Sequence, residues 1–402
     1  MFERIEVMQC PPFGIVDALR QADHVLLGLC LTANLYGLAM IYSATRWKAE
    51  YHSMPIKQVI AMCIGIVLYF VVSQFNIQLL VDKWRWVVAG CTVFILLLRT
   101  PLGADIGGNR AWLQIPGIPF NIQPAEIVKL FFTMLLAQML LKFKNPKELS
   151  EVPSVARLVG VLLYFCGLIF VISSDAGSAL IYVFIFIFMI WAAGIYKRWF
   201  VAGLGICALG IFGIIKFLPA DNRWRARLLI CIDHDADPLG VGFQQTRSYL
   251  AVRSGGLTGQ GFMNGSLVQA KYSSALPERH TDFIFSSITE ELGLVGALAV
   301  ILLLCAIILR CLYIASTAGD QFSSYVCIGY AGMLIAQVTL NIGMCLYVLP
   351  VIGITLPFFS YGGSSIMTMY VTMGIVSGIR IRSRPNWLKD QPSPTRGGKP
   401  GI

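Results

Sequence analysis

The chain has 402 residues, of which 56% are hydrophobic and 13% are charged, about half the charged fraction of an average soluble domain. Its mean hydropathy is +0.71, and its uncharged stretches often approach the roughly 20 residues that a membrane-spanning helix needs. These properties exclude a soluble enzyme, a coiled coil and a disordered protein. The formal net charge of +10 is explained by loops that face anionic lipid, so no nucleic-acid partner is predicted.

Uncharged stretches predict ten membrane-spanning helices in an all-α polytopic fold. In chain order they are 25–45, 58–81, 86–98, 130–141, 158–174, 176–196, 199–215, 292–309 and two helices within 321–379. The last stretch has no charged residue, and Pro350, Pro357 and Gly362-Gly363 predict a hairpin at 349–363 between its two helices. The bundle 25–379 is then preceded by a cytoplasmic segment 1–24 and followed by a basic, disordered tail 380–402.

The distribution of Lys and Arg predicts the orientation in the membrane. With the N-terminus inside, the inner segments hold seventeen of these residues and the short outer loops hold six. Because cytoplasmic loops carry an excess of Lys and Arg, both termini are expected in the cytoplasm. The large loop 219–282, between helices 7 and 8, is then expected outside.

The first polar group near the outer membrane edge precedes and enters the fourth span. It comprises 107–112 and 123–129, and Pro124 suits the first position of a helix. Glu126 then lies in the first turn, with Lys129 three residues later on the same face. The pair could stabilise the helix start as an ion pair, or it could hold a metal ion or a diphosphate.

Two further acidic groups have simple structural explanations. Asp175, between spans 5 and 6, is fully explained as the N-cap of span 6. The stretch 233–238 resembles the start of a calcium loop, but it lacks the required glycine and closing glutamate. It is therefore interpreted as a solvated turn.

A dense polar run, 277–285, leads directly into the eighth span. Asp282 could cap that helix, but capping does not require the neighbouring charged residues 278–280. In a regular helix Glu290 would lie roughly 12 Å along the axis from Asp282, too far for a glycosidase-type pair of carboxylates. Asp282 is therefore expected to act as a lone base.

The last polar group, 358–365, precedes the tenth span. Gly362-Gly363 before a helix exposes backbone N–H groups that suit an anion. A tight turn with a serine N-cap is the alternative.

Five motifs in this order on a ten-span chain resemble the SEDS family (shape, elongation, division and sporulation) of cell-wall polymerases. The match extends from about the first span to the tenth. The motifs are Arg110-Ala111-Trp112 with Gln123-Pro124-Ala125-Glu126, Asp175-Ala176-Gly177-Ser178, the stretch 255–261, the run 277–285 with Glu290-Glu291-Leu292-Gly293, and the stretch 356–365. Ala125 stands where the family usually has Ser, and Ser174 and Ala176 stand where Pro and Leu are common.

The resemblance implies a peptidoglycan glycosyltransferase of the bacterial cytoplasmic membrane that polymerises lipid II at the outer face, for cell elongation, shape or division. It also implies a growing lipid-linked glycan and a class B penicillin-binding protein transpeptidase as partners, besides membrane lipids. In the family, the acid that matches Asp282 is the proposed catalytic residue, and those matching Trp112 and Glu126 are functionally implicated. The run 277–282 looks more like the rod-shape (RodA) branch than the division (FtsW) or sporulation (SpoVE) branches.

A lipid-linked diphosphate is a good leaving group once its charge is neutralised, so one base and a group of cations suffice for this chemistry. Asp282 is the predicted base. Glu126 and Asp282 could ligate Mg²⁺ or Mn²⁺, and Glu126 and Asp175 are supporting residues. The candidates for substrate or diphosphate binding are Arg110, Trp112, Lys129, Glu278, His280, Ser360, Tyr361, Gly362 and Gly363.

Two other functions stay open at this point. A transporter that flips lipid II would show broken helices at matching midplane positions, whereas the polar groups here gather at the predicted outer ends. A non-catalytic scaffold of the cell-wall machinery is the third hypothesis.

Overall fold

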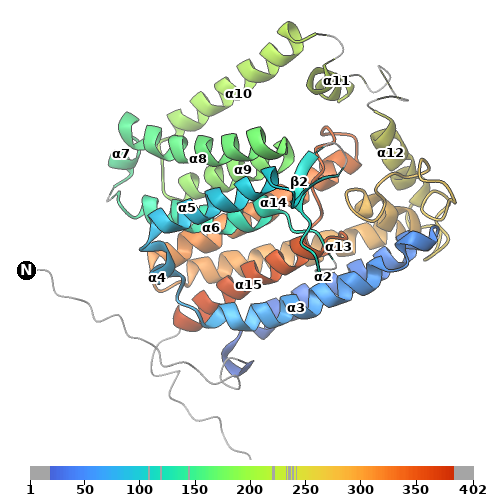
Figure 1. Cartoon of the computed structure of the whole chain (residues 1–402), viewed down its shortest axis with the longest axis horizontal. Helices are drawn as coiled ribbons and strands as arrows, with labels where there is room; N and C mark the ends of the chain where they lie inside the picture. The colour runs from blue at the N-terminus through green and yellow to red at the C-terminus, as the bar shows by residue number, and fades with distance from the viewer. Residues whose placement is uncertain are drawn as a thin grey trace, which may run out of the picture.

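The computed structural model describes residues 19–106, 109–117, 120–143, 145–219, 222–231, 233, 237, 240 and 242–383. Most of the regular structure is helical, and most helices run side by side in one bundle (Figure 1). The longer helices are α2 (His24–Thr45), α3 (Met54–Gln74), α5 (Trp84–Leu96), α6 (Pro124–Leu140), α8 (Val152–Ser173), α9 (Ala176–Ala192), α10 (Lys197–Phe217), α12 (Phe243–Gly255), α13 (Ile284–Ser316), α14 (Gln321–Cys345) and α15 (Gly363–Ser383). The shorter elements are η1 (Ala49–Tyr51), α4 (Ile77–Val81), η2 (Leu97–Arg99), α7 (Pro146–Leu149), α11 (Arg223–Ile230) and the strands β1 (Gly103–Ile106) and β2 (Asn109–Leu113).

The protein is a multi-pass, all-α membrane protein, as predicted. Seven described helices are long and apolar enough to cross a membrane, namely α2, α3, α8, α10, α13, α14 and α15. The other three predicted spans coincide with the shorter helices α5, α6 and α9. The number of crossings and the cytoplasmic position of the termini stay predictions.

Four helices differ from the expected bounds for physical reasons. The second span breaks after Gln74, because the side chain of Asn76 accepts the N–H of Gln78 and starts the separate helix α4. Helices α6 and α13 begin before the uncharged stretches, since Glu126 in the first turn of α6 and Glu290 further along α13 are paired inside the protein. Helix α15 runs to Ser383, so the first residues of the predicted tail are helical; 384–402 and 1–18 lie outside the described residues.

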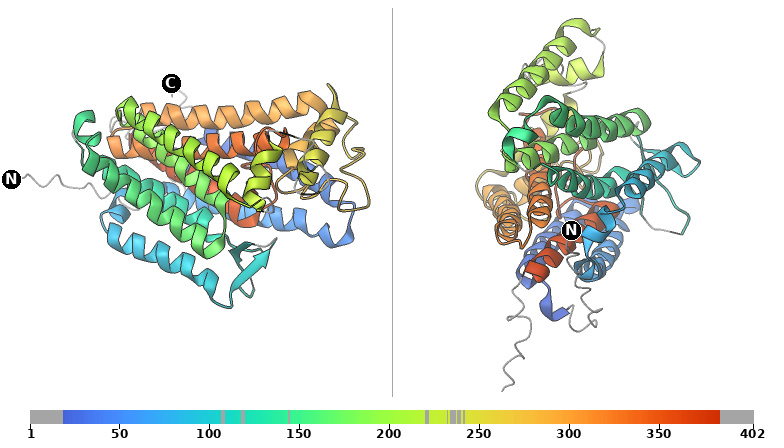
Figure 2. Two further views of the ribbon diagram at one scale, coloured as in Figure 1. Left: turned by 90° about the horizontal axis from the view of Figure 1, so that it is seen from above. Right: turned by 90° about the vertical axis from the view of Figure 1, so that its left-hand side faces the viewer.

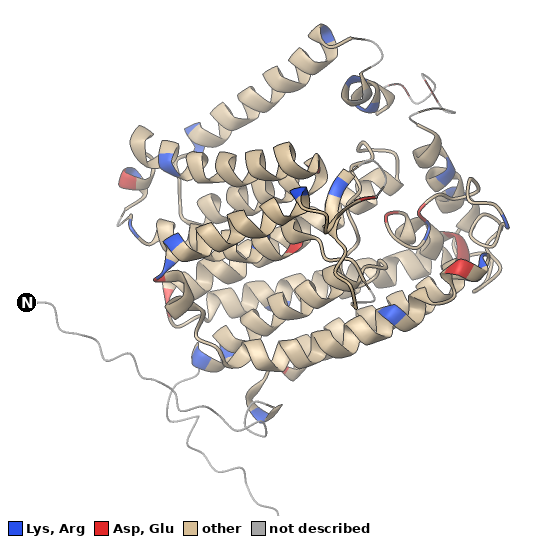
Figure 3. Cartoon of the chain, in the orientation of Figure 1, with Lys and Arg blue, Asp and Glu red and all other residues tan. Residues whose placement is uncertain are grey.

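Helices α14 and α15, near the end of the chain, pack in the core against helices from earlier segments. Helix α15 packs along α3, while α14 packs against both α9 and α13. By contrast, α10 has no buried residue and stands at the upper edge with α11 in Figure 1 and in the right-hand view of Figure 2. Lys, Arg, Asp and Glu lie mainly toward the ends of the bundle, and the middle of the helices is largely free of them (Figure 3).

A small β-hairpin, which the sequence pattern did not predict, projects beside the bundle (Figure 2). Strands β1 and β2 are antiparallel, and Ala104 pairs with Trp112. Strands this short cannot display a readable alternation of apolar and polar residues. The hairpin brings the Trp112 side chain to the cavity described below.

The helical conformation of α13 is interrupted at Gly293, and main-chain groups of a distant loop form the hydrogen bonds that the interruption leaves unmade. Gly293 has φ 67° and ψ −163°, a conformation essentially restricted to glycine. The carbonyls of Glu290 and Glu291 accept the N–H groups of residues 260 and 261 at 3.0 and 2.9 Å. The N–H groups of residues 294 and 295 donate to the carbonyls of 256 and 257 at 3.0 and 3.3 Å. The glycine-rich stretch 255–261 is thus joined to the broken helix through the main chain.

Candidate active site

A cavity of about 430 Å³ opens among the ends of several helices and the loops between them. Six of the residues singled out in the sequence line it: Trp112, Glu126, Asp175, Glu278, Asp282 and Tyr361. They come from segments far apart in the chain, and four of the six carry carboxyl groups. The cavity therefore combines an acidic wall with aromatic side chains.

Asp282 lies in the turn before α13, partly exposed to the cavity. It does not cap the helix, because the N-cap is Phe283 and no side-chain cap bond is made there. Its main-chain carbonyl instead accepts a 2.8 Å bond from Nδ2 of Asn341 on α14. The same Nδ2 donates at 2.7 Å to the carbonyl of Ile354. One side chain of α14 thus links two segments that line the cavity.

Burial raises the pKa of the Asp282 carboxyl to about 7, and the charges of Glu278 and Asp175 add to the rise. A carboxyl group tuned to this range can exchange a proton near neutral pH, as a general base must. Glu278 itself has a left-handed φ of 47°, and its carbonyl accepts the N–H groups of Thr281 and Phe283, both at 3.1 Å. This turn sets the chain direction just before Asp282.

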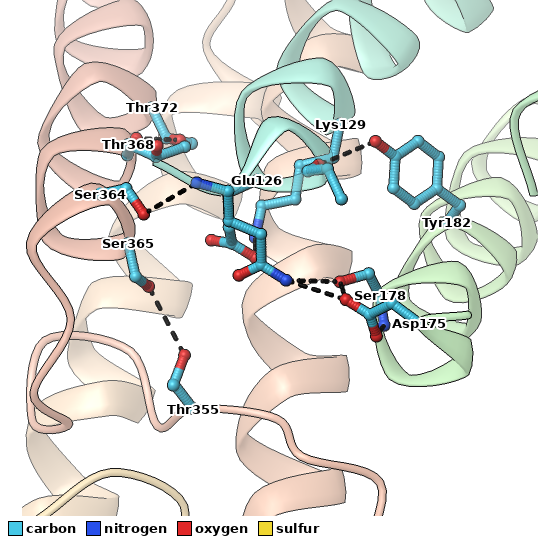
Figure 4. Close-up of polar contacts among 12 residues, drawn as sticks. Glu126, Lys129, Asp175, Ser178, Tyr182, Thr355, Ser364, Ser365, Thr368 and Thr372 are labelled. Atoms are coloured by element: carbon cyan, nitrogen blue, oxygen red, sulfur yellow. Dashed lines mark hydrogen bonds and ion pairs between the residues drawn. The ribbon is translucent and has the colours of Figure 1, made fainter. Parts of the chain in front are cut away.

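Glu126 and Lys129 form the predicted ion pair at the start of α6, with 2.6 Å between Nζ and Oε1. Pro124 is in the first turn, as predicted. Lys129 is 1% exposed and does not line the cavity, whereas Glu126 does. The second carboxylate oxygen, Oε2, is buried and has no hydrogen-bond partner among the described residues. Figure 4 shows the pair beside Asp175.

Asp175 is the N-cap of α9, as predicted. Its Oδ1 accepts the N–H of Ser178 at 2.9 Å, and its Oδ2 accepts the Ser178 hydroxyl at 2.6 Å. Nε2 of Gln123 donates to the same Oδ2 at 2.8 Å, which connects the start of α6 to the start of α9 (Figure 4). Capping thus uses much of the hydrogen-bonding capacity of this carboxylate.

The residues before α15 mostly hold the turn that carries Asp282. The Ser360 hydroxyl donates to the carbonyl of Thr281 at 2.7 Å, and the N–H of Tyr361 donates to the carbonyl of His280 at 2.8 Å. The N–H of Gly362 donates to Oε1 of Gln58 at 3.2 Å. A Cβ on Gly363 would lie 2.7 Å from Phe120, so this glycine permits close packing.

Arg110 and His280 do not line this cavity. The guanidinium of Arg110 donates to the carbonyl of Thr100 at 3.0 Å, within the connection that leads to the hairpin. His280 is buried and lines a smaller neighbouring cavity, which Glu278 also lines.

The comparisons with known proteins match nearly the whole chain. The family model described as a cell cycle protein, which groups FtsW, RodA and SpoVE, matches residues 23–384. The chain belongs to this family. The predicted SEDS resemblance is thereby confirmed.

Named relatives and solved structures of the FtsW/RodA/SpoVE family agree with this assignment. The chain is 30% identical over 363 residues to the peptidoglycan glycosyltransferase MrdB of Escherichia coli (strain K12), covering 90% of this chain and 94% of that one. It is 33% identical to stage V sporulation protein E of Bacillus subtilis (strain 168), covering 90% and 98%. A chain from the structural study of polymerization and crosslinking by a peptidoglycan synthase complex has a TM-score of 0.75, 28% identity and coverage of 90% and 98%. A mutant of the Thermus thermophilus rod shape determining protein RodA has a TM-score of 0.64, 25% identity and coverage of 89% and 97%.

Several cavity residues of this FtsW/RodA/SpoVE protein had received no role from the sequence: Asn109, Gln123, Arg227, Gln244, Gln337 and Thr355. Gln337 was detectable in principle, because a polar side chain inside an uncharged span is a functional candidate by default. Its Oε1 is buried without a partner among the described residues. Arg227 lies in the large loop, where no local pattern separates it from its basic neighbours. Most of the stretch 233–238 lies outside the described residues.

The cavity wall offers oxygen atoms to a hard cation. Within the described parts of the chain, no three His, Cys, Asp or Glu side chains form a metal-binding group. Glu126 and Gln337 nevertheless line the same cavity as Asp282, and each has a buried side-chain oxygen, Oε2 and Oε1 respectively, without a described partner. Mg²⁺ binds through one or two carboxylates and substrate phosphates rather than a complete protein cage, so these residues fit the predicted Mg²⁺ or Mn²⁺.

Proposed function

We propose that this protein, a peptidoglycan glycosyltransferase, polymerises lipid II into glycan strands at the outer face of the cytoplasmic membrane, with Asp282 as the general base. The observation that carries the proposal is the position of Asp282. Its carboxyl group, with a pKa raised to about 7, lines a cavity large enough for part of a sugar diphosphate. The named glycosyltransferase relatives support the reaction class.

The reaction then needs one proton acceptor and charge neutralisation. The Asp282 carboxylate takes the proton from the acceptor sugar hydroxyl as that oxygen attacks the anomeric carbon of the donor. The bond from the anomeric carbon to the diphosphate oxygen breaks, the lipid diphosphate leaves with the electron pair, and the configuration inverts. A positioned base of this kind typically contributes about 10²–10⁴-fold to the rate.

Cationic groups are proposed to stabilise the leaving diphosphate. Arg227 lines the cavity as a cationic residue, while Lys129 balances the charge of Glu126. A bound Mg²⁺ or Mn²⁺ would neutralise negative charge on the leaving group. The other oxygen of Glu126, which has no described partner, would help to hold such a cation. Trp112 and Tyr361 supply aromatic walls beside these groups.

A class B penicillin-binding protein is the proposed transpeptidase partner. The proposal is supported by the similarity to a chain from a peptidoglycan synthase complex in which polymerization and crosslinking are coordinated. Lipid II, the growing lipid-linked glycan and membrane lipids complete the proposed set of partners.

The decisive experiment compares purified wild-type protein, Asp282→Asn and Asp105→Asn with lipid II, alone and with the partner, and measures glycan chains. Asp105 carries the same chemical group but is exposed in β1, outside the cavity. We expect wild type and Asp105→Asn to polymerise equally, and Asp282→Asn to lose at least about 10²-fold in rate while staying folded.

Full polymerisation by Asp282→Asn would contradict its role as the base. A wild type that makes no polymer with its partner, yet moves lipid II across vesicles, would identify a transporter. A scaffold would be indicated if Asp282→Asn supported normal cell growth.

A further inference from the structure

A second cavity, of about 220 Å³, lies beside the proposed active site and has no role in the reaction described so far. Trp47 and Tyr51 line it from the segment after α2, Phe243 from the start of α12, and His280 from the polar run before α13. Glu278 lines both cavities. The same short run of chain therefore forms a wall of each.

Two residues that line this cavity each have a buried polar atom without a described hydrogen-bond partner. His280 is 8% exposed, and its Nδ1 has no partner among the described residues. Nε1 of Trp47 is likewise buried without a described partner. A buried polar group left unpaired costs about 1–3 kcal/mol, so two such groups on residues that line one cavity indicate something that supplies the missing bonds.

The walls are unsuited to a phosphate group. Arg279 is the cation of this cavity, but its guanidinium is engaged within the protein. It donates to the carbonyls of Leu276 and Tyr272 at 3.0 and 2.9 Å and lies 4.5 Å from the centre of the Trp47 ring. Burial lowers the pKa of His280, as does the charge of Arg279, while Glu278 opposes the change. The imidazole is therefore neutral at pH 7.

Neutral hydrogen-bonding groups between apolar rings match a sugar instead. A sugar ring presents C–H groups to aromatic walls, and its hydroxyls both donate and accept hydrogen bonds. Trp47 can only donate, whereas a neutral histidine has one donor and one acceptor nitrogen. The volume lies below the roughly 300–1,000 Å³ of ordinary small-molecule pockets, which fits a single sugar unit.

Direct contacts connect this cavity to the reacting centre. The ring of His280 lies 5.2 Å from that of Tyr51 and 5.9 Å from that of Tyr361, which lines the first cavity. The carboxylate of Glu278 accepts the hydroxyl of Thr281 at 2.9 Å, and Thr281 also lines the first cavity. The two cavities are thus neighbours on either side of Glu278.

We propose that the second cavity is a saccharide subsite, which binds the sugar unit next to the one that reacts at Asp282. In this subsite Trp47 Nε1 donates to a sugar oxygen, and His280 Nδ1 bonds to a sugar hydroxyl. The inference rests on the proposed function, because it assigns the sugar to the lipid-linked glycan of that reaction.

The test uses a soluble glycan fragment of two disaccharide repeats, without lipid or diphosphate, as an inhibitor of lipid II polymerisation. The variants are Trp47→Phe, which keeps an aromatic ring but removes the donor, and the matched control Trp86→Phe. Trp86 is 79% exposed and lines neither cavity. We expect the half-inhibitory concentration to rise roughly 2–10-fold for Trp47→Phe, the value of one hydrogen bond, and to stay unchanged for Trp86→Phe.

A second pair of variants tests the histidine. His280→Phe should weaken inhibition by the fragment to a similar extent, and His280→Asn, which keeps a polar atom near the position of Nδ1, should restore part of it. Inhibition by inorganic pyrophosphate should be the same in all of these proteins. Equal inhibition of Trp47→Phe and wild type by the fragment would overturn the subsite even if His280→Phe failed to fold.

Calorimetric titration with the same fragment separates this inference from the proposed function. If wild type polymerises lipid II but does not bind the fragment, the subsite is wrong and the function stands. If wild type does not polymerise but binds the fragment more tightly than Trp47→Phe does, the function is wrong and the cavity still binds saccharide.

Discussion

At the cavity wall, Asp282 shares a confined space with the carboxyl groups of Glu278 and Asp175. Burial and these two charges act in the same direction on its pKa. Glu126 is in a different situation, because Lys129 neutralises it and one of its oxygens stays unpaired. The acidic residues of one cavity therefore have different chemical capacities, which their neighbours determine.

The pKa of about 7 for Asp282 predicts the pH dependence of polymerisation. Only the carboxylate can accept a proton, so kcat/KM should rise with pH to a plateau, with a midpoint near 7 rather than near the ordinary value of about 3.9. Initial rates at low lipid II concentration measure this quantity for the free enzyme. Glu278→Gln should lower the midpoint, since it removes a charge that raises the pKa. A midpoint below pH 5 in wild type would contradict the assignment.

Glu126→Gln should strongly destabilise the protein, because it leaves the ammonium of Lys129 buried without a counter-charge. Breaking a buried pair in this way costs about 3–5 kcal/mol, which thermal unfolding in detergent would register as a lower Tm. The double variant Glu126→Gln, Lys129→Met should recover most of the stability.

Activity of that double variant distinguishes two roles of Glu126. If the carboxylate only balances Lys129, polymerisation returns together with stability. If it holds a cation at the diphosphate, as proposed, the double variant is stable but slow, and added Mg²⁺ has little effect on its rate.

At the level of elements, the loop that precedes the active-site turn binds the main-chain groups left unpaired by the break in α13. The side chains of the broken turn reinforce the main-chain pairing. Glu290 accepts the N–H groups of Leu267 and Val268 at 2.7 and 2.9 Å, and Glu291 accepts the hydroxyl of Ser43 at 2.7 Å. These acids therefore anchor the loop 256–270 rather than line the cavity, and Arg279 binds carbonyls of the same loop.

Gly293→Ala should destabilise this junction. A Cβ at this position would lie 2.4 Å from both the nitrogen of Gly259 and the carbonyl oxygen of Leu257, and φ of 67° already disfavours any other residue. The combined strain and overpacking amount to about 2–5 kcal/mol, measurable as a lower unfolding temperature. Gly210→Ala is the matched control, because a Cβ there meets nothing within 4 Å and favours helix. Equal Tm values for the two variants would contradict this account of the junction.

Across the whole molecule, helices distant in sequence are joined at the end of the bundle away from the cavity by Asp23. Its carboxylate lies 3.0 Å from Nε of Arg310 on α13 and 2.6 Å from a guanidinium nitrogen of Arg380 on α15. The Tyr69 hydroxyl on α3 donates to the main-chain carbonyl of Asp23 at 2.9 Å. One fully buried acid thus connects α2, α3, α13 and α15.

Asp23→Asn should loosen this connection and leave two arginines without their counter-charge. We expect the free energy of unfolding to fall by about 3 kcal/mol. This is the low end for a buried pair, because both arginines reach solvent. Thermal unfolding should report the loss, while the polymerisation rate at low temperature stays close to wild type. Glu50→Gln, in the exposed pair with Lys48, should leave the Tm unchanged. Equal Tm values for Asp23→Asn and Glu50→Gln would contradict the proposed role of Asp23 in joining these helices.

The sequence by itself determined the membrane class, the positions of the apolar helices and the family. Hydropathy acts residue by residue, and caps such as Pro124 and Asp175 act within one turn, so both can be recognised locally. The i,i+3 pair of Glu126 and Lys129 was predictable for the same reason. The ten apolar stretches all coincide with helices, whereas the small hairpin and the break at Gly293 depend on partners far along the chain.

Only the tertiary structure decided which polar groups share a site. Asp282, Trp112 and Glu126 meet because the packing of α6, α14 and the turn before α13 brings their segments to one cavity. Packing likewise directs Ser360 and Arg279 toward main-chain carbonyls, and leaves the Nδ1 of His280 unpaired beside Trp47. Burial and hydrogen bonding are properties of an environment that distant residues create, so the composition of one segment cannot reveal them.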